Sequence, residues 1–198
     1  DLIFNVSKND KKFAADFFVQ NNLKDSDFVV SLSPVSRQPY KVWPAKNFAF
    51  ITDWLIREYK AKILFLWGPN ENHFVEDVIQ NMQMAGETIY DYAIPTLTET
   101  KALLEKVDYH FGNDNGIRHF AIAAGTPTFA VFGRPFPENW TPPNQNLHRW
   151  IEFDPGCKSD CTYPKCEHLN CINLVDVRKA QHIIKHQIEE LKLYEQTT

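Results

Sequence analysis

The residues of this chain best suited to bind a ligand lie in a Gly-Asn-Asp-Asn-Gly turn at residues 112–116. Asp114 and Asn115 are residue types that cap helices, and Gly116 has no Cβ to keep a ligand away from the backbone. A helix that begins here has unpaired N–H groups and the positive end of its dipole, so the turn can bind an anion. His119, about one helical turn further on, can add a side-chain donor. The alternative is that Asp114 only caps the helix and His119 only packs, which turn chemistry alone would explain.

A second group of polar residues lies in the loop after the apolar run at residues 27–33. Arg37 and Lys41 could both stabilise a pyrophosphate, Arg37 through a bidentate fork and Lys41 as a mobile point charge. The alternative is that both are ordinary solvated loop cations. Ligands of open parallel sheets bind beyond the carboxyl ends of the strands. This loop and the 112–116 turn can therefore face one crevice.

Glu71 follows a further apolar run, at residues 62–67, through the turn Gly-Pro-Asn. A carboxylate near a strand end can accept hydrogen bonds from the two hydroxyls of a ribose, as acidic residues do in nucleotide-binding folds. A glutamate equally suits the first turn of a helix. Glu71 is therefore a candidate ribose ligand with a plain structural alternative.

Four cysteines, Cys157, Cys161, Cys166 and Cys171, lie within fifteen residues, with His168 among them. Four thiolates could hold a tetrahedral zinc ion. Their spacing differs from the usual pair of Cys-x2-Cys hooks, so two disulfides or four free thiols are alternatives. Thiols stay reduced in a cytosolic protein, which favours a metal over disulfides. We expect a structural role for this segment.

The candidate ligands need a scaffold of alternating strands and helices, and the hydrophobic pattern supplies one. Helices are expected at residues 7–22, 44–55, 71–84, from Thr98 as cap through 104, from 115, and at 175–193; strands at 27–33, 62–67, 88–90, 107–111, 128–132 and 150–153. Between them lie a long loop at 134–148 and a cysteine-rich loop at 154–172. Short apolar strands that alternate with helices predict a parallel sheet covered on both faces, which is a Rossmann-like α/β fold.

The composition limits the classes of partner. At 198 residues the chain is one domain, residues 1–198, or one half of a two-domain enzyme. Its net charge of −4 argues against nucleic acid or an anionic membrane as the main partner. No apolar run approaches the length of about eighteen residues that a membrane span needs. The chain begins Asp-Leu-Ile-Phe with no initiator Met, so we expect position 1 to be an internal point of a longer product.

The stretch DNGIRHFAIAAGTPTFAVFG, residues 114–133, resembles the nucleotide-binding signature of glycosyltransferase family 9, the heptosyltransferases of lipopolysaccharide core synthesis. That signature has the general form Asp-Ser/Thr-Gly-x-x-His, an alanine-rich helix, Gly-x-Pro-Thr and a strand that ends in Phe-Gly. The segments Lys-Val-Trp-Pro at 41–44 and Gly-Pro-Asn-Glu at 68–71 are similar to two further elements of the family. The resemblance covers nearly the whole chain.

The resemblance implies a binding site for a nucleotide sugar, ADP-heptose, and a role for each candidate residue. The implied donor-binding residues are Asp114, Asn115 and Gly116 in the phosphate turn, His119 and Lys41 for charge, Ser36 for phosphate, Glu71 for ribose and Leu97 against adenine. Arg37 stands where the family often has a small or hydroxyl residue. For Leu97, a loop side chain that covers the core is the competing explanation.

Members of the family have two Rossmann-like domains that face a cleft, the GT-B arrangement. The resemblance implies that this chain is the carboxyl-terminal, donor-binding half, with the amino-terminal acceptor domain absent. That other domain would bind the lipid A-core acceptor and carry the catalytic base, so this chain by itself holds no catalytic residue and is expected to be inactive. No cofactor is implied for catalysis, and any zinc would be structural.

The family works in the cytoplasm, at the cytoplasmic face of the inner membrane, so peripheral membrane association is expected here. Two alternatives follow from the residues. The chain could belong to another GT-B enzyme, such as a nucleotide-sugar epimerase, which would differ in the nucleotide it prefers. It could instead be a non-catalytic, zinc-stapled interaction module, which would bind metal and no nucleotide.

Overall fold

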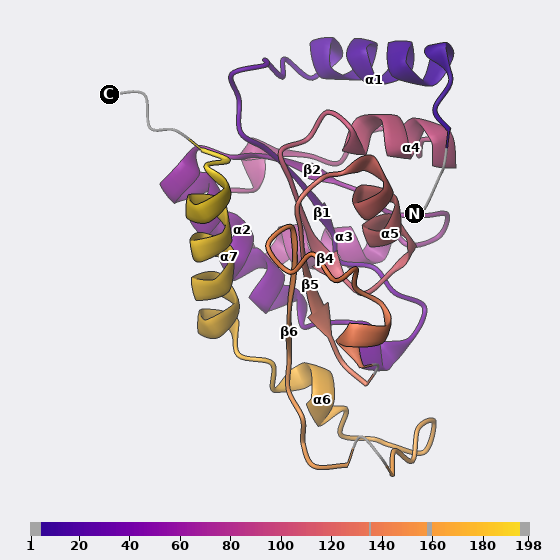
Figure 1. The fold of residues 1–198 in the computed structure, drawn as a ribbon, viewed down its shortest axis with the longest axis vertical. Helices are drawn as coiled ribbons and strands as arrows, with labels where there is room; N and C mark the ends of the chain where they lie inside the picture. The colour runs from indigo at the N-terminus through magenta and orange to yellow at the C-terminus, as the bar shows by residue number, and fades with distance from the viewer. Residues whose placement is uncertain (1–4, 135, 158–159, 195–198) are drawn as a thin grey trace.

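A six-stranded parallel sheet forms the centre of the computed structural model, which describes residues 5–134, 136–157 and 160–194 (Figure 1). The strands are β1 (Val29–Ser33), β2 (Lys62–Phe65), β3 (Thr88–Ile89), β4 (Tyr109–Asn113), β5 (Thr128–Phe132) and β6 (His148–Glu152). Their order is β3-β2-β1-β4-β5-β6, and every pairing is parallel. The order reverses between β1 and β4, as in doubly wound nucleotide-binding sheets. The predicted Rossmann-like α/β fold is confirmed.

Helices cover both faces of this sheet (Figure 1). One face packs against α2 (Ala45–Tyr59), α3 (Asn72–Asn81) and α7 (Val177–Leu191), and the other against α1 (Lys8–Gln20), α4 (Leu97–Leu104) and α5 (Gly116–Ala124). Side chains alternate between the two faces along each strand, so Val30 and Leu32 of β1 enter the first core and Val29 enters the second. This arrangement leaves the loops at the carboxyl ends of the strands free to form a site.

The helix termini mostly follow the sequence prediction. Ser7 caps α1 in a capping box with Asp10, which places the helix within the predicted range. The predicted cap of α4 is wrong by two residues. Thr96, not Thr98, accepts from the backbone N–H of Glu99, and the Thr98 hydroxyl instead donates to Asp10 at 2.9 Å. Two threonines so close together both fit a cap, and the contact with α1 decides between them.

The fourth strand lies two residues later than predicted, because Gly112 and Asn113 belong to β4 rather than to the turn. Gly112 pairs with Ser33 of β1, and a Cβ at position 112 would lie 2.5 Å from the Ser33 carbonyl oxygen. Glycine is therefore needed for strand contact at this point. The turn shortens to Asp114 and Asn115, directly at the sheet edge.

Short helices complete the chain: the 3-10 segments η1 (Pro39–Lys41), η2 (Ala85–Glu87) and η3 (Pro137–Asn139), and the helix α6 (Asn170–Asn173). The segment η3 lies in the loop predicted at 134–148, and α6 lies at the end of the predicted cysteine-rich loop. The sixth strand begins at His148, two residues before its predicted start. In the described part of the chain, no helix combines the length and apolar character needed to cross a membrane.

A row of polar side chains crosses the sheet on the face that α5 covers. Ser31, His110, Thr128 and His148 occupy laterally paired positions on β1, β4, β5 and β6. The Ser31 hydroxyl lies 2.9 Å from Nδ1 of His110, and the Thr128 hydroxyl lies 3.1 Å from Nδ1 of His148. Burial, and then the charge of Arg118, lowers the pKa of His110 to about 3 and that of His148 to about 4. Both imidazoles are therefore neutral in the folded protein near pH 7.

Candidate functional site

The candidate site lies beyond the carboxyl ends of β1 and β4, where the strand order reverses. The loop after β1 is held to the end of β4 by the buried side chain of Asn113. Its Oδ1 accepts from the backbone N–H of Trp43 at 3.1 Å, and its Nδ2 donates to the Pro34 carbonyl at 2.7 Å. The two sequence motifs are therefore joined by hydrogen bonds from the sheet itself, at the edge where the crevice is predicted.

Asn115 is the N-cap of α5, and both the oxygen and the nitrogen of its side-chain amide form hydrogen bonds. Oδ1 accepts from the backbone N–H of Arg118 at 3.0 Å, while Nδ2 donates to the Ser33 hydroxyl at 2.9 Å and to the Val35 carbonyl at 3.0 Å. The cap thus fixes the amino terminus of α5 against the end of β1. A helix terminus held in this way directs its free N–H groups and dipole at the crevice.

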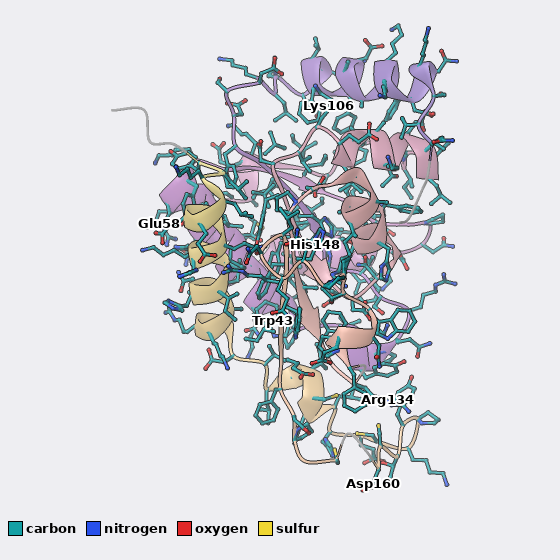
Figure 2. All side chains as sticks on the ribbon, viewed as in Figure 1. Trp43, Glu58, Lys106, Arg134, His148 and Asp160 are labelled. Atoms are coloured by element: carbon teal, nitrogen blue, oxygen red, sulfur yellow. The ribbon has the colours of Figure 1, made fainter. Side chains whose placement is uncertain are left out.

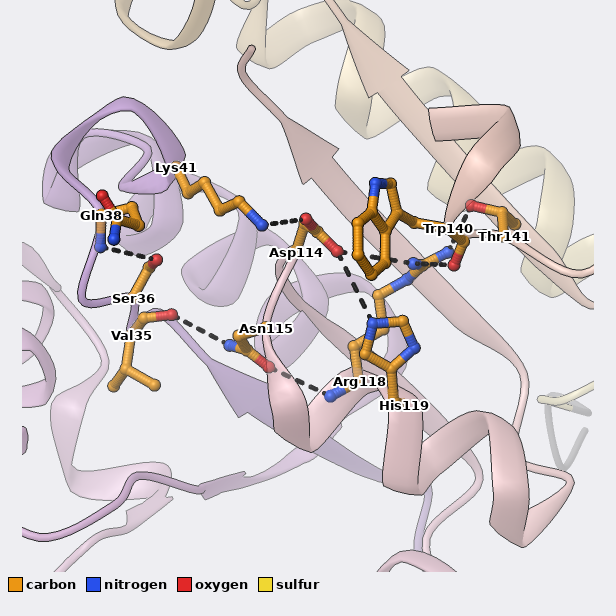
Figure 3. Close-up of polar contacts among 10 residues, drawn as sticks. All are labelled: Val35, Ser36, Gln38, Lys41, Asp114, Asn115, Arg118, His119, Trp140 and Thr141. Carbon is orange, nitrogen blue, oxygen red and sulfur yellow. Dashed lines mark hydrogen bonds and ion pairs between the residues drawn. The ribbon is translucent and has the colours of Figure 1, made fainter. Parts of the chain in front are cut away.

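Asp114 does not cap the helix, so the alternative reading of that residue is wrong. Its carboxylate is 2% exposed and accepts from Nζ of Lys41 at 2.6 Å (Figure 3). The other carboxylate oxygen lies 3.9 Å from both Nη1 of Arg118 and Nε2 of His119. Asp114 therefore forms the centre of a cluster of basic side chains contributed by the loop after β1 and the helix α5.

The cluster carries a net positive charge near pH 7. Lys41 and Arg118 are cationic, Asp114 is anionic, and His119 is neutral because burial, followed by the charge of Arg118, lowers its pKa. The side chain of Lys41 is 20% exposed and that of His119 is 33% exposed, so both reach solvent. An anion that binds here would meet one ammonium, one imidazole and the helix terminus.

The structure places Ser36, Arg37 and Gly116 around the same loop and helix terminus. Ser36 is nearly buried, and its oxygen accepts from the backbone N–H of Gln38 at 3.2 Å, which leaves its hydroxyl proton to donate elsewhere. Arg37 is exposed on the same loop. No atom lies within 4 Å of the position a Cβ would take on Gly116, so the space above this residue is open.

Glu71 and Leu97 lie at the neighbouring strand ends, after β2 and β3. Glu71 is the N-cap residue of α3, and its Oε2 accepts from the backbone N–H of Gly68 at 2.9 Å. Leu97 is the first residue of α4 and is 63% exposed. The competing explanation for Leu97, that it covers the core, is therefore wrong.

Sequence reasoning did not select Arg118 and Trp140, which the structure brings to this site. Arg118 is fully buried; its Nη1 donates to the Trp140 carbonyl at 3.1 Å and its Nη2 to the Thr141 hydroxyl at 2.8 Å. Burial lowers its pKa to about 10, so it stays charged near pH 7. A cation within the otherwise apolar helix 116–124 is the signal in the sequence, but its partners in the loop before β6 could not be read from spacing.

The four cysteines lie in the segment after β6, at the end of the molecule where Figure 2 labels Arg134 and Asp160. All four are half-buried free thiols, which excludes the disulfide alternative in this structure. They line one pocket with Arg134, Pro155 and His168. Burial, followed by the other three thiols, raises the pKa of Cys171.

The pocket has the donor set of a thiolate metal site, but its ligands do not converge. Sγ of Cys166 lies 3.7 Å from Nε2 of His168. Among the residues that the structure describes, no three His, Cys, Asp or Glu side chains are arranged tightly enough to hold a metal ion. Residues 158–159, inside the predicted loop 154–172, lie outside the described residues.

Comparison with known proteins adds to this geometry. The family model described as glycosyltransferase family 9 (heptosyltransferase) matches residues 3–169. Lipopolysaccharide heptosyltransferase 1 of Campylobacter coli is 28% identical over 100 residues, which are 50% of this chain and 29% of that protein. The chain spans 29 to 43% of the length of the curated relatives that it matches.

Two solved structures have the same fold over about half of their length. The crystal structure of a family 9 glycosyltransferase from Veillonella parvula matches with a TM-score of 0.80 at 21% identity, over 96% of this chain and 54% of that chain. The heptosyltransferase WaaC of E. coli, solved with ADP-2-deoxy-2-fluoro heptose, matches with a TM-score of 0.55 at 19% identity, over 89% of this chain and 47% of that chain.

Proposed function

The chain belongs to glycosyltransferase family 9, the heptosyltransferases, and we propose that it is the donor-binding domain of an enzyme that transfers heptose from ADP-heptose to the lipopolysaccharide inner core. The observation that carries this proposal is the pairing of Lys41 with Asp114 at 2.6 Å, at the strand reversal between β1 and β4. Doubly wound sheets bind nucleotides at this point of the fold. WaaC, a relative in fold, is solved with an ADP-sugar analogue.

The pyrophosphate of the donor would lie at the amino terminus of α5. There Lys41 would donate to a phosphate oxygen, and Asp114 would hold the ammonium in place. His119 would donate to the same group in its protonated form, because a nearby diphosphate raises the pKa that burial has lowered. Ser36 and the exposed Arg37 would contact the phosphates from the loop after β1.

These contacts would lower the barrier to sugar transfer. When an acceptor hydroxyl attacks the anomeric carbon, the bond to the diphosphate breaks and negative charge develops on the leaving phosphate. Lys41, His119 and the N–H groups at the start of α5 would stabilise that charge, which is often the largest single catalytic effect. This stabilisation of the leaving group would need no metal, and the proton of the acceptor hydroxyl would pass to the base that the amino-terminal domain supplies.

The nucleoside would lie toward β2 and β3. Glu71 would accept from the ribose hydroxyls through the oxygen that Gly68 does not occupy, and the exposed Leu97 would cover the adenine. By resemblance to the family, the lipid A-core acceptor and the catalytic base belong to an amino-terminal domain. We therefore propose that this chain alone binds the donor without transferring its sugar, and that the enzyme works at the cytoplasmic face of the inner membrane.

A structural zinc ion is a separate part of the proposal. Four thiols and one imidazole share a single pocket, and thiolate is a preferred ligand of zinc. The ion would stabilise the segment 154–172, which follows β6 and packs on the loop after β1 through Tyr163 and Tyr40, and it would take no part in sugar transfer.

Calorimetric titration of the chain with ADP, UDP and GDP, without added metal, tests the donor site. We expect preferential binding of ADP, and Lys41→Ala should weaken it. The matched control is Lys165→Ala, an exposed lysine of the cysteine-rich loop, which should bind ADP like the unmodified chain. Preference for UDP would favour another GT-B enzyme, such as a nucleotide-sugar epimerase. Bound metal with no nucleotide binding would favour the zinc-stapled interaction module.

A further inference from the structure

Arg118 is a charged side chain in the interior that phosphate binding does not explain. Its side chain is fully buried, with a relative exposure of 0%. The guanidinium carbon Cζ lies 5.1 Å from the centroid of the Phe132 ring. A buried guanidinium needs partners for its N–H groups, and here Nη1 and Nη2 have them, whereas Nε has no hydrogen-bond partner among the described residues. Two of those groups bind Trp140 and Thr141, in the loop between β5 and β6. The hydrogen bonds of Arg118 therefore hold this loop against α5.

The loop between β5 and β6 in turn fixes the position of one aromatic ring, that of Trp140. Trp140 is 52% exposed, yet its ring centroid lies 5.8 Å from Nζ of Lys41 and 6.2 Å from the ring of His119 (Figure 3). Because Arg118 holds the backbone carbonyl of Trp140 itself, the starting point of the side chain is fixed. An exposed indole is thus kept beside two side chains of the proposed pyrophosphate site.

The order of the strands gives this ring a place along the ligand. Glu71 and Leu97 follow β2 and β3, the Lys41 and Asp114 pair lies after β1 and β4, and Trp140 follows β5. A nucleotide sugar that lies along this edge, with its nucleoside over β2 and its pyrophosphate over β1 and β4, extends its sugar toward β5. The ring of Trp140 lies on that side of the pyrophosphate.

We propose that Trp140 forms one wall of the sugar subsite and that Arg118 is the positioning residue that holds it there. This inference rests on the proposed donor-binding function. An indole presents a large, rigid apolar face, which suits the C–H face of a sugar ring. The same face offers a phosphate no favourable contact. Trp140 therefore distinguishes a nucleotide sugar from the bare nucleotide.

The test compares the affinities of ADP and ADP-heptose by calorimetry in the 198-residue chain and its variants. We compare the affinity for ADP-heptose divided by the affinity for ADP. This affinity ratio should fall about tenfold in Trp140→Ala and in Arg118→Met. Thr141→Val, which removes one acceptor and keeps Arg118, should lower the ratio by about threefold. The matched control is Phe136→Ala, because Phe136 is an equally exposed aromatic residue of the same loop, and its ratio should not change.

Fluorine NMR of chain labelled with 5-fluorotryptophan reports on the position of the ring independently of affinity. The Trp140 signal, assigned from its loss in Trp140→Phe, should shift on addition of ADP-heptose and should already differ in Thr141→Val before any ligand is added. Arg118→Met adds to this comparison if it folds, and Thr141→Val suffices if it does not.

Three results would overturn the inference. If Trp140→Ala weakened ADP and ADP-heptose by the same factor, the ring would not contact the sugar. If Phe136→Ala lowered the ratio as much, the effect would belong to the loop in general. If Thr141→Val changed neither the ratio nor the Trp140 signal, Arg118 would not position the ring. Failure of the unmodified chain to bind either ligand would instead remove the proposed donor site, and this inference with it.

Discussion

The crevice after β1 and β4 and the pocket of the four cysteines both gather polar side chains, but they differ in what holds those side chains. In the crevice, Asn113 and Asn115 extend from the sheet edge and bind the backbone of the neighbouring loop, and Asp114 is almost fully buried among cations. In the cysteine pocket the thiols are half-buried and their sulfur atoms do not converge.

The difference shows that residue type alone does not make a site. Strand ends fix the crevice because each strand is held by its neighbours and by two hydrophobic cores. The cysteine segment has no strand, and its only helix among the described residues 154–157 and 160–172 is the start of the four-residue α6. We therefore expect the crevice to be formed before its ligand binds, and the cysteine pocket to depend on a bound ion.

Two glycine substitutions compare the loop after β1 with the cysteine segment. A Cβ on Gly133 would lie 1.8 Å from the carbonyl oxygen of Tyr40, next to Lys41, so Gly133→Ala must displace the loop after β1. We expect a loss of roughly 3 kcal/mol or more in the free energy of unfolding, and loss of ADP binding. Gly156→Ala in the cysteine segment meets no atom but has a positive φ, so it should lose only about 1 kcal/mol. Urea unfolding measures both, and equal losses would contradict the contrast.

Acid should weaken the sheet beneath the crevice. His110 and His148 have pKa values near 3 and 4 in the folded chain, below the ordinary value of 6.5, so the unfolded state binds more protons below pH 6.5. Stability is then fully present above pH 6.5 and falls as the pH drops toward 4. The loss between pH 7 and pH 5.5 should be about 2 kcal/mol for the pair. Urea unfolding at several pH values checks this, with His110→Gln and His148→Gln as variants that should reduce the slope.

Removal of Lys41 should separate the two roles of its ion pair. Lys41→Ala leaves the buried carboxylate of Asp114 without its closest cation, and we expect about 2 kcal/mol less stability and ADP binding weakened by about thirtyfold. Adding Asp114→Asn should recover part of that stability, because it removes the buried carboxylate that lost its closest cation, while ADP affinity stays low. Recovery of ADP affinity in the double variant would show that Lys41 serves only to neutralise Asp114.

Removal of metal should have the smallest effect on the crevice. We expect about one zinc ion per chain in metal analysis, and chelation should destabilise the cysteine segment while ADP affinity changes by less than about twofold. The double variant Cys161→Ser and Cys171→Ser should behave like the chelated chain. Absence of zinc from freshly purified chain would reject the zinc ion, and loss of ADP binding on chelation would show that the two regions are coupled.

Much of the fold could be predicted from the sequence, because hydrophobic periodicity and turn residues are local signals. The strands and helices were predicted with boundary differences of a few residues. The missed boundaries have tertiary causes: β4 extends to Asn113 because Gly112 allows close contact with β1, and α4 begins after Thr96 because Thr98 is engaged by α1.

Only part of the candidate site could be predicted from the sequence. The turn at 112–116, Lys41 and Glu71 could be selected because capping residues, cations and carboxylates at strand ends have recognisable chemistry. Arg118 and Trp140 could not be paired from the sequence, since the loop between β5 and β6 has no periodic pattern that would place it over α5. The separate parts played by Asp114 as ion-pair centre and Asn115 as cap were also undecided, because both residue types suit both positions.

The sequence by itself determined the class of fold, the strand ends that carry polar residues and the family to which the chain belongs. Only the tertiary structure decided which of these residues meet. It joined Lys41 to Asp114 across 73 positions of sequence, and it packed Tyr163 of the cysteine-rich loop against Tyr40, beside Lys41, with the ring centroids 4.5 Å apart. The physical reason is that helix and strand preferences act over a few neighbouring residues, whereas a binding site depends on the order and register of strands, which packing of the whole chain sets.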